Sequence, residues 1–386
     1  MSITKLDQEY VAATYGRFSL ELREGMGAVV YDTEAHEYID MGTGIAVNTF
    51  GYSDEEWVLA VTAQLSALQH TSNLYYTEPC AKLAKLLCIR TGMKKVFFGN
   101  SGAEANECAI KTARRYSFQK YGEGRSTIVT LKNSFHGRTI TTLAATGQDT
   151  FHTEFGPFTE GFVYADANDT KSVISLAKDN NACAVMMELV QGEGGVMKLD
   201  DSFVKEVADY CDKNDILLII DEVQTGNGRT GSLYAFQQFG ITPDIVSTAK
   251  GLGGGLPIGA CMLGEKVKDT LTPGSHGSTF GGNPVVCAGA YNIISRIDDE
   301  LLAGVRRKSE YIFSELSSAE GIKSVSGMGL MIGLETQKDA KEVVTKCREM
   351  GVLVLTAKTK VRLLPPLNIA DELLEKAVKI IKEAVK

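Results

Sequence analysis

The chain has 386 residues, of which 44% are hydrophobic and 23% are charged. This composition is typical of a globular protein, and the length allows one large hydrophobic core and a second, smaller one. The formal net charge of −8 argues against nucleic acid and against an anionic membrane surface as partners, and no apolar run approaches the length of a membrane span.

The first residues, MSITKLDQEYVAATYG, lack the apolar core of a signal peptide, so we expect a cytoplasmic protein. Further on, short apolar runs rich in Val and Ile alternate with longer amphipathic runs, as buried parallel strands alternate with helices. This rhythm predicts an α/β domain with a mostly parallel sheet. The expected strands span 95–99, 127–131, 184–190, 216–221 and 245–249, and the expected helices span 103–121, 170–179 and 202–214.

The pattern changes after about residue 281. A helical stretch over 284–318 leads into short strand-like pieces at 322–326, 328–335, 351–356 and 361–364, with helices at 337–350 and 370–385. This pattern predicts a second, smaller α/β domain. Because no low-complexity linker or charge block separates the two parts, we expect them to pack closely.

The first chemical motif is FFGNSGAEANECAIKTARR, residues 97–115, where a strand runs into a helix. Ser101 and Glu104 have the spacing of a capping box. If Ser101 caps the amide of Glu104, the amides of Gly102 and Ala103 stay free at the positive end of the helix dipole. They can then bind a phosphate, although a well-capped helix without a ligand explains the motif equally well.

Loops after two later strands carry three further candidates. In NSFHGRT, Phe135 can act as a stacking platform and Arg138 as a bidentate clamp for a carboxylate. A packed loop aromatic and a solvated arginine are the simpler alternatives. In VQGEGGV, Glu193 lies between glycines just after a strand, and a turn explains the glycines but not the acid.

Asp221 ends the apolar run ILLII, at the edge of the sheet where ligands of parallel α/β domains bind. A helix cap is the alternative, but a buried acid needs a partner. The following residues 226–231 match G-x-G-x-x-G, so a nicotinamide-dependent dehydrogenase is an alternative function. A dinucleotide fingerprint directly follows its strand and opens a helix; here Glu222 to Thr225 intervene, and we interpret the match as accidental.

Lys250 follows the apolar run IVSTA and precedes GLGGG. A P-loop has its glycines before the lysine, so this order does not indicate a nucleotide site. A lysine in a surface turn is the ordinary alternative. However, small neighbours leave room for a planar ligand, and desolvation lowers the pKa of a lysine and makes it a nucleophile.

The cysteines and histidines indicate neither disulfides nor a metal site. None of the eight cysteines forms a C-x-x-C pair, and most lie in apolar stretches, which is typical of buried free thiols in a reducing compartment. The five histidines lack H-x-H or H-x-x-x-H spacing. We therefore expect no metal.

Together, a phosphate pocket, an aromatic platform, a buried acid and a desolvated lysine are the parts that hold pyridoxal phosphate. In chain order, NSGAEANE, SFHGRT, QGEGG, DEVQTGNGRTG, AKGLGGGLPIGA and HGSTFGGNP resemble the class III aminotransferases. These pyridoxal-phosphate enzymes have fold type I, the aspartate-aminotransferase fold. The similarity runs from about Tyr15 to the C-terminus. It implies a large cofactor-binding domain over 44–280, a small C-terminal domain over 281–386, and an N-terminal segment, 1–43, that contributes to the small domain.

The resemblance also implies roles for single residues around the cofactor. Lys250 would hold its aldehyde covalently, Asp221 would pair with the pyridinium nitrogen, and Gln224 would bond the phenolic oxygen. Phe135 and Val223 would cover the two faces of the ring. Ser101, Gly102 and Ala103 would bind the phosphate together with Thr279 of the partner subunit in a homodimer with shared active sites, and Glu222 belongs to the same cofactor-binding set.

Within the class, SNLYYTEP, FHGRT and HGSTFGGNP are most similar to the acetylornithine aminotransferases of arginine biosynthesis. The implied reaction is a ping-pong transfer of an amino group from N2-acetyl-L-ornithine to 2-oxoglutarate, giving N-acetylglutamate 5-semialdehyde and glutamate. Lys250 would move the proton as general base and acid. Arg138, Ser278 and nearby Tyr15 would bind acetylornithine. Arg362 would bind the α-carboxylate of glutamate, and Glu193 would neutralise Arg362 when the other substrate is bound.

Several alternatives stay open. Ornithine, succinylornithine, 4-aminobutyrate or an acyl-lysine could be the donor, the protein could also serve lysine biosynthesis, and a mutase acting on glutamate semialdehyde shares the fold. A non-enzymatic binding protein is a further alternative. One departure from the family pattern is Asn227, where the family more often has an apolar residue; the resemblance gives this position no chemical role.

Overall fold

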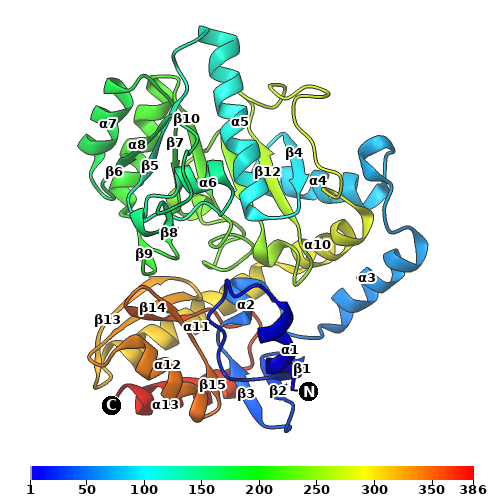
Figure 1. Cartoon of the computed structure of the whole chain (residues 1–386), viewed down its shortest axis with the longest axis vertical. Coiled ribbons are helices and arrows are strands. Elements are labelled where there is room, and N and C mark those ends of the chain that lie inside the picture. Colours follow the sequence, from blue (N-terminus) through cyan, green and yellow to red (C-terminus); the bar gives the residue numbers. More distant parts are fainter. Residues whose placement is uncertain (1) are drawn as a thin grey trace.

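The computed structural model describes residues 2–386, which form two α/β parts (Figure 1). The larger part is built on a seven-stranded sheet with the order β4-β12-β11-β10-β7-β5-β6. β12 is antiparallel to both neighbours and the remaining pairs are parallel, so the prediction of a mostly parallel sheet is confirmed. The strands are β4 (Lys95–Gly99), β5 (Thr127–Leu131), β6 (Phe162–Ala165), β7 (Ala182–Met187), β10 (Leu217–Asp221), β11 (Ile245–Thr248) and β12 (Gly259–Leu263).

Several helices pack against this sheet and bury an apolar stripe on it. In α8, for example, Phe203, Val207 and Cys211 recur at intervals of one turn and are buried. The helices of this part are α2 (Thr43–Ala46), α3 (Glu55–Ala67), α4 (Glu78–Thr91), α5 (Gly102–Tyr121), α6 (Ile140–Ala145), α7 (Thr170–Asp179), α8 (Asp201–Lys213), α9 (Phe236–Phe239) and α10 (Pro284–Arg296), with short 3₁₀ turns η1 (Ser72–Leu74), η2 (Asp149–Phe151) and η3 (Lys250–Leu252).

The smaller part combines both ends of the chain, and Figure 1 shows the blue N-terminal strands beside the orange and red C-terminal elements. It contains the sheets β1-β2-β3-β15 and β13-β14-β17-β16. Its elements are α1 (Ile3–Tyr10), β1 (Leu22–Met26), β2 (Val29–Asp32), β3 (Glu37–Asp40), α11 (Asp299–Ser317), β13 (Ile322–Met328), β14 (Met331–Thr336), α12 (Ala340–Glu349), β15 (Val352–Leu353), β16 (Leu355–Ala357), β17 (Lys360–Leu363) and α13 (Asp371–Val385). A short ribbon of β8 (Val190–Gln191) and β9 (Met197–Lys198) follows β7 of the larger part in sequence, and β9 lies against β13.

Two contacts bear on the division into domains. β3 pairs in parallel with β15, with Ile39 opposite Val352, which favours assigning the N-terminal segment to the small domain. α10, however, packs against α3 and α4 and its apolar residues belong to the core of the larger part. We therefore propose a boundary between α10 and α11, near Ile297, in place of residue 281.

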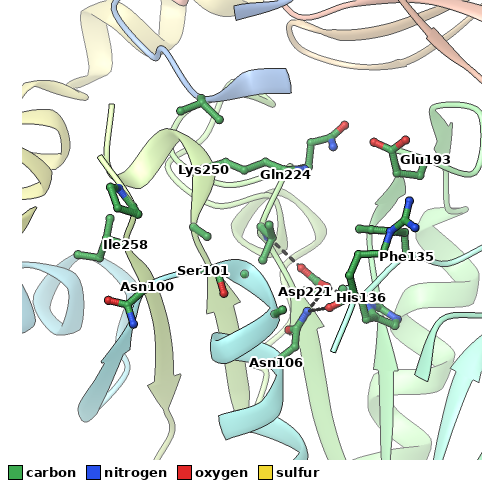
Figure 2. A pocket seen from close by; sticks show the side chains of 18 of the residues that line it. Asn100, Ser101, Asn106, Phe135, His136, Glu193, Asp221, Gln224, Lys250 and Ile258 are labelled. Atoms are coloured by element: carbon green, nitrogen blue, oxygen red, sulfur yellow. Dashed lines mark hydrogen bonds and ion pairs between the residues drawn. The ribbon is translucent and has the colours of Figure 1, made fainter. Parts of the chain in front are cut away.

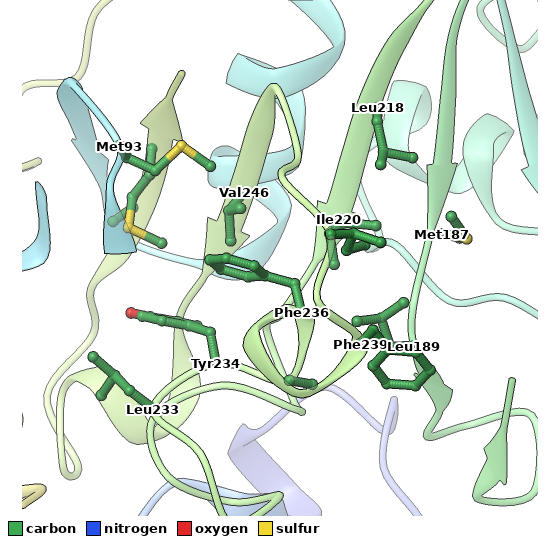
Figure 3. Close-up of a cluster of buried hydrophobic side chains, with 14 of the residues drawn as sticks. Met93, Met187, Leu189, Leu218, Ile220, Leu233, Tyr234, Phe236, Phe239 and Val246 are labelled. Carbon is green, nitrogen blue, oxygen red and sulfur yellow. The ribbon is translucent and has the colours of Figure 1, made fainter. Parts of the chain in front are cut away.

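The main core lies under the strands that carry the candidate site. Tyr234 and Phe236 stack with ring centroids 6.2 Å apart, and Figure 3 shows them beside Ile220 of β10 and Val246 of β11. Tyr234, Ile220 and Val246 are fully buried. This close packing fixes β10 and β11 relative to each other.

Several elements differ from the sequence prediction. The strand expected over 184–190 ends at Met187, the helix expected over 284–318 is two helices separated at Ile297 and Asp298, and the strand expected over 351–356 is divided into β15 and β16. Among the elements that were not predicted are β1 to β3, β6, β12, α3 and α4. No helix among residues 2–386 combines the length and the apolar character needed to cross a membrane.

Candidate active site

A cavity of about 450 Å³ lies where several strands of the large sheet end. Most of the residues that line it follow the carboxyl ends of β4, β5, β7, β10 and β11. This edge of a parallel sheet is where backbone groups and loop side chains converge on a ligand. The lining includes Asn100, Ser101, Gly102, Ala103, Asn106, Phe135, His136, Arg138, Glu188, Glu193, Asp221, Val223, Gln224, Ala249 and Lys250.

Asp221 is held at the base of this cavity by two buried side chains (Figure 2). Its Oδ2 accepts a hydrogen bond from Nδ2 of Asn106 at 2.8 Å and lies 2.8 Å from Nδ1 of His136. Its Oδ1 accepts from the amide of Val223 at 3.0 Å. All three side chains of this cluster are at most 3% exposed, so the carboxylate has little freedom to turn.

Lys250 begins the turn after β11 with φ of +46°, a conformation that costs about 1 kcal/mol or more for a non-glycine residue. Figure 2 shows its side chain extending toward Gln224. Burial lowers the pKa of the Lys250 amine; the Glu193 carboxylate opposes this effect and the Arg362 guanidinium adds to it. The lysine is therefore available as a neutral amine at lower pH than an exposed lysine.

The N-terminus of α5 faces the same cavity. Ser101 is its N-cap: the Ser101 Oγ accepts from the amide of Glu104 at 3.2 Å, and the Glu104 carboxylate accepts from the amide of Asn100 at 2.7 Å. Within residues 2–386, the amides of Gly102 and Ala103 donate to no protein acceptor. These two N–H groups at the positive end of a twenty-residue helix can bind an anion.

Gly102 is held close to Val223, which follows β10. A Cβ atom at Gly102 would lie 2.7 Å from Cγ1 of Val223. The absence of a side chain therefore lets the start of α5 approach the loop after Asp221, and it brings the free amides and the carboxylate into one cavity.

An arginine and an acid form an ion pair at the cavity wall. The Nη1 of Arg362 lies 2.5 Å from Oε1 of Glu193 and donates to Oε1 of Gln224 at 3.3 Å. Arg362 is 3% exposed, and its Nε is buried without a hydrogen-bond partner among the described residues. Burial raises the pKa of Glu193, but the charge and hydrogen bond of Arg362 outweigh burial and leave the pKa below its usual value.

Phe135 and Arg138 also line the cavity. The guanidinium carbon of Arg138 is 4.3 Å from the ring centroid of Phe151 and 5.6 Å from that of Phe135. The amide of Phe135 donates to Oε1 of Glu188 at 2.8 Å. Burial raises the pKa of Glu188 to about 7. The electrostatic effect of His136 opposes this rise, and that of the Asp221 carboxylate adds to it.

Residues 10–385 match the family model described as "Aminotransferase class-III". The chain belongs to the class III aminotransferases. The expected family and fold type I are thereby confirmed, since class III aminotransferase structures superimpose on the whole chain.

Named class III relatives cover nearly the whole chain. An acetylornithine aminotransferase from Haemophilus ducreyi is 53% identical over 99% of this chain and 98% of its own length. The crystal structure of N-acetylornithine aminotransferase from Stenotrophomonas maltophilia has a TM-score of 0.86 at 35% identity, covering 99% and 98% of the two chains. The ornithine aminotransferase from Toxoplasma gondii ME49 has a TM-score of 0.95 at 32% identity, covering 99% and 94%.

Class III aminotransferases use pyridoxal phosphate, and the cavity fits this cofactor. The free amides of Gly102 and Ala103 suit its phosphate, and the crowded contact of Gly102 with Val223 leaves the helix end accessible only because residue 102 has no side chain. Asp221 offers a fixed carboxylate for a ring nitrogen, and Lys250 offers an amine for an aldehyde.

Five residues of the predicted set do not line the cavity of this chain. Arg362 lies behind the cavity wall, where it donates to Glu193 and Gln224, two residues that do line the cavity. The Glu222 carboxylate points away from it and accepts from the Thr225 hydroxyl and from the amide of Phe236 at 2.8 Å. Tyr15 is 73% exposed. Ser278 accepts from Nδ2 of Asn100 at 3.1 Å but does not line the cavity, and Thr279 is exposed.

His136, Asn106 and Glu188 were not among the residues predicted from the sequence. His136 lies inside the quoted motif SFHGRT, and Glu188 interrupts the apolar run AVMMELV, just as Asp221 ends ILLII. The same rule, that a buried acid needs a partner, would have identified Glu188. Asn106 gives no such signal, because an asparagine near the start of a helix is common and only the tertiary fold brings it to Asp221.

Proposed function

We propose that the protein is an acetylornithine aminotransferase that transfers the δ-amino group of N2-acetyl-L-ornithine to 2-oxoglutarate in a ping-pong reaction of arginine biosynthesis. The products are N-acetylglutamate 5-semialdehyde and glutamate. The observation that carries the proposal is the placement of Lys250 in one cavity with Asp221, the free amides of α5 and Glu193, which pairs with Arg362 behind the cavity wall. The donor follows the names of relatives at 41–53% identity.

The residues of the chain divide the work of this reaction. Bound pyridoxal phosphate supplies an electron sink that stabilises charge on the substrate carbon as a proton leaves. Asp221, held by His136 and Asn106, keeps a proton on the cofactor's ring nitrogen. Lys250, with its lowered amine pKa, takes the proton from the substrate carbon and returns it as general base and acid.

Glu193 and Arg362 can accommodate two substrates of different charge. With Glu193 on Arg362, as in this structure, the wall has little net charge and suits acetylornithine, which would contact Arg138. When 2-oxoglutarate binds, its carboxylate would displace Glu193 and pair with Arg362, whose Nε is a free buried donor. Glycines at 192, 194 and 195 allow the acid to swing.

We also propose a homodimer with shared active sites. Leu74, Tyr75, Tyr76 and Phe280 are large apolar side chains that are each at least 60% exposed, and such a group is typical of a surface that another protein covers. Thr279 lies beside Phe280 and is likewise exposed. In the dimer, Thr279 of the partner subunit would reach the phosphate, while Ser278 and Tyr15 would contact acetylornithine.

The eight cysteines are all free, and this supports a cytoplasmic location, because reducing compartments keep thiols unpaired. Six of them are buried. Their role is then one of packing.

The central test is covalent labelling of the protein purified with its cofactor. Borohydride reduction followed by peptide mapping is expected to place the pyridoxyl group on Lys250, and a Lys250→Ala variant is expected to lose turnover by at least about 10³-fold. Lys132→Ala is the matched control, because Lys132 also follows a strand but lies at the surface, paired with Asp166 at 2.7 Å. A label on another lysine would contradict the assignment.

The donor is tested by comparing kcat/KM for acetylornithine, ornithine, succinylornithine, 4-aminobutyrate and an acyl-lysine, with 2-oxoglutarate as acceptor. Acetylornithine is expected to be the preferred donor. A preference for 4-aminobutyrate or ornithine would overturn the donor while leaving the aminotransferase activity intact. Turnover of glutamate semialdehyde without 2-oxoglutarate would instead indicate a mutase.

A further inference from the structure

Asn227 connects the two segments that carry the site. It lies in the turn after β10, three residues beyond Gln224, and is 3% exposed. Its Nδ2 donates to the carbonyl oxygen of Ala249 at 3.0 Å and to Oγ1 of Thr248 at 3.1 Å. Its Oδ1 accepts from the hydroxyl of Tyr234 at 3.4 Å. The amide group of this side chain therefore has a protein partner on both of its polar atoms.

The Ala249 carbonyl belongs to the peptide group that joins Ala249 to Lys250. Rotation of this peptide would change the direction in which the Lys250 side chain leaves the backbone. Lys250 is held at φ of +46°, where an unbranched side chain is disfavoured, so the surrounding structure has to maintain this conformation. The hydrogen bond from Asn227 is a direct restraint on it.

A second contact restrains the other side of the same turn. The hydroxyl of Thr49 donates to the carbonyl of Gly251 at 2.8 Å. The turn is thus fixed before and after the lysine, and only the contact made by Asn227 comes from the segment that also carries Asp221 and Gln224.

Asparagine suits this position for two physical reasons. Its φ is +58°, a left-handed conformation that asparagine tolerates better than other non-glycine residues. Its amide supplies an N–H donor at a buried carbonyl, which an apolar residue cannot do. The side chain thereby supplies a hydrogen bond to the Ala249 carbonyl inside the protein.

We propose that Asn227 is a positioning residue that sets the orientation of the Lys250 amine through the Ala249 carbonyl. This inference rests on the proposed role of Lys250 in proton transfer. It changes the expectation from sequence, in which Asn227 had no chemical role. Asn227 does not touch the cavity, so its effect is expected on the step in which Lys250 acts and not on cofactor affinity.

The test compares Asn227→Gly and Asn227→Leu with the unchanged protein. Glycine keeps the left-handed backbone without strain but removes the donor, and leucine fills the space without donating. Both are expected to lower kcat about tenfold while cofactor affinity and KM change by no more than about twofold. In the cofactor-free protein, the pH midpoint for modification of Lys250 by fluorodinitrobenzene, read by peptide mass spectrometry, is expected to move toward that of an ordinary lysine.

Asn181→Gly is the matched control. Asn181 also has a left-handed φ, of +48°, and its Nδ2 also donates to a backbone carbonyl, that of Gly124, at 3.0 Å. It lies before β7, outside the cavity, so this variant is expected to keep both kcat and the Lys250 midpoint.

Two results would overturn the inference. One is an Asn227→Gly protein with unchanged kcat and unchanged midpoint. The other is a joint fall of kcat, cofactor affinity and thermal stability while the midpoint for Lys250 stays the same. This result, which includes a variant that folds poorly, would indicate a purely structural asparagine. Neither result affects the proposed function, which is tested on the unchanged protein by the label on Lys250 and by the comparison of donors.

Discussion

Asp221 and Glu222 are adjacent acids with opposite surroundings. Asp221 faces the cavity and its carboxylate is bonded by His136 and Asn106, whereas Glu222 is fully buried on the other side of the chain against Thr225 and Phe236. Successive side chains of an extended segment point to opposite faces. For this reason only one of the two acids can serve the cofactor, although both lie in the same motif.

Glu222 is expected to make the stability of the cofactor-free protein depend on pH. Burial raises its pKa to about 7, so the folded chain keeps a proton that the unfolded chain releases above its ordinary pKa of 4.5. The stabilisation is present below pH 4.5 and is lost as the pH rises to about 7, by up to about 3 kcal/mol. Glu222→Gln should remove this loss, because the Thr225 hydroxyl can accept from the new amide.

The measurement is the melting temperature of the cofactor-free protein between pH 5 and pH 8. The difference between Glu222→Gln and the unchanged protein is expected to grow in favour of the variant as the pH rises. Glu310→Gln, at an exposed position of α11, should give a curve parallel to that of the unchanged protein. A parallel curve for Glu222→Gln as well would contradict the raised pKa.

Glu193→Gln is expected to separate the two half-reactions. The variant leaves the buried Arg362 charge without its acid, so the wall stays positive for both substrates. KM for acetylornithine should rise about tenfold or more, while KM for 2-oxoglutarate stays the same or falls. The two half-reactions can be followed separately by stopped-flow absorbance of the cofactor.

Glu315→Gln is a suitable comparison for that experiment, because Glu315 also forms an ion pair, with Lys382 at 2.9 Å, but on the small part of the molecule. It should leave both KM values unchanged. Equal rises for the two substrates in Glu193→Gln would argue that Glu193 only supports the cavity wall.

Local pattern was enough to find single residues with an unusual context. Lys250 and Asp221 each follow an apolar run that predicts a buried strand, and the structure brings both to the cavity. Asn227 was noted as a departure from the family pattern, but the resemblance gave this position no chemical role. Its hydrogen bonds to residues 248 and 249 depend on the pairing of β10 with β11, which a sequence pattern does not specify.

At the scale of elements, α5 combines a cap and an anion site. Ser101 occupies the amide of Glu104, and the two amides before it, those of Gly102 and Ala103, stay free for a phosphate. Because α5 starts directly after β4, its position relative to Asp221 follows from the strand order of the sheet.

Gly102→Ala is expected to weaken cofactor binding. A Cβ there would lie 2.7 Å from Val223, so the helix end or the loop after Asp221 must shift. Titration followed by visible absorbance should show a dissociation constant for pyridoxal phosphate at least about tenfold higher, corresponding to about 1.4 kcal/mol.

Gly304→Ala in α11 provides the comparison, since a Cβ at Gly304 meets no atom within 4 Å. It should leave cofactor affinity unchanged and stabilise the helix by about 0.5–1 kcal/mol. Unchanged affinity in Gly102→Ala would show that the start of α5 tolerates displacement and does not bind the phosphate closely.

Most strands and helices could be predicted because burial on both faces and amphipathic spacing leave clear patterns. The bounds of β4, β5 and α7 agree with the prediction residue for residue. β12 was missed because GACML follows a glycine-rich turn and runs antiparallel to its neighbours, without the helix that normally precedes a parallel strand. The break between α10 and α11 is a single short kink that amphipathic spacing does not resolve.

At the scale of the whole molecule, the exposed apolar group around Tyr76 and Phe280 predicts a dimer. Tyr76→Glu is expected to shift the protein toward monomers in sedimentation. It is also expected to raise the dissociation constant for the cofactor, because the proposed contact of Thr279 of the partner subunit with the phosphate would be lost. Phe118→Glu is the comparison, since Phe118 is also exposed at 58% but lies at the far end of α5. A monomeric unchanged protein with full activity would refute shared sites.

The pairing of β3 with β15 has a consequence for biosynthesis. Ile39 and Val352 are about 300 residues apart in sequence, and a contact of such separation forms late in folding. On the ribosome, β1 to β3 emerge first but have to wait for their partner until most of the chain has been made, while the large sheet, whose strands lie between, can already assemble. The first strands to be synthesised are thus among the last to be completed.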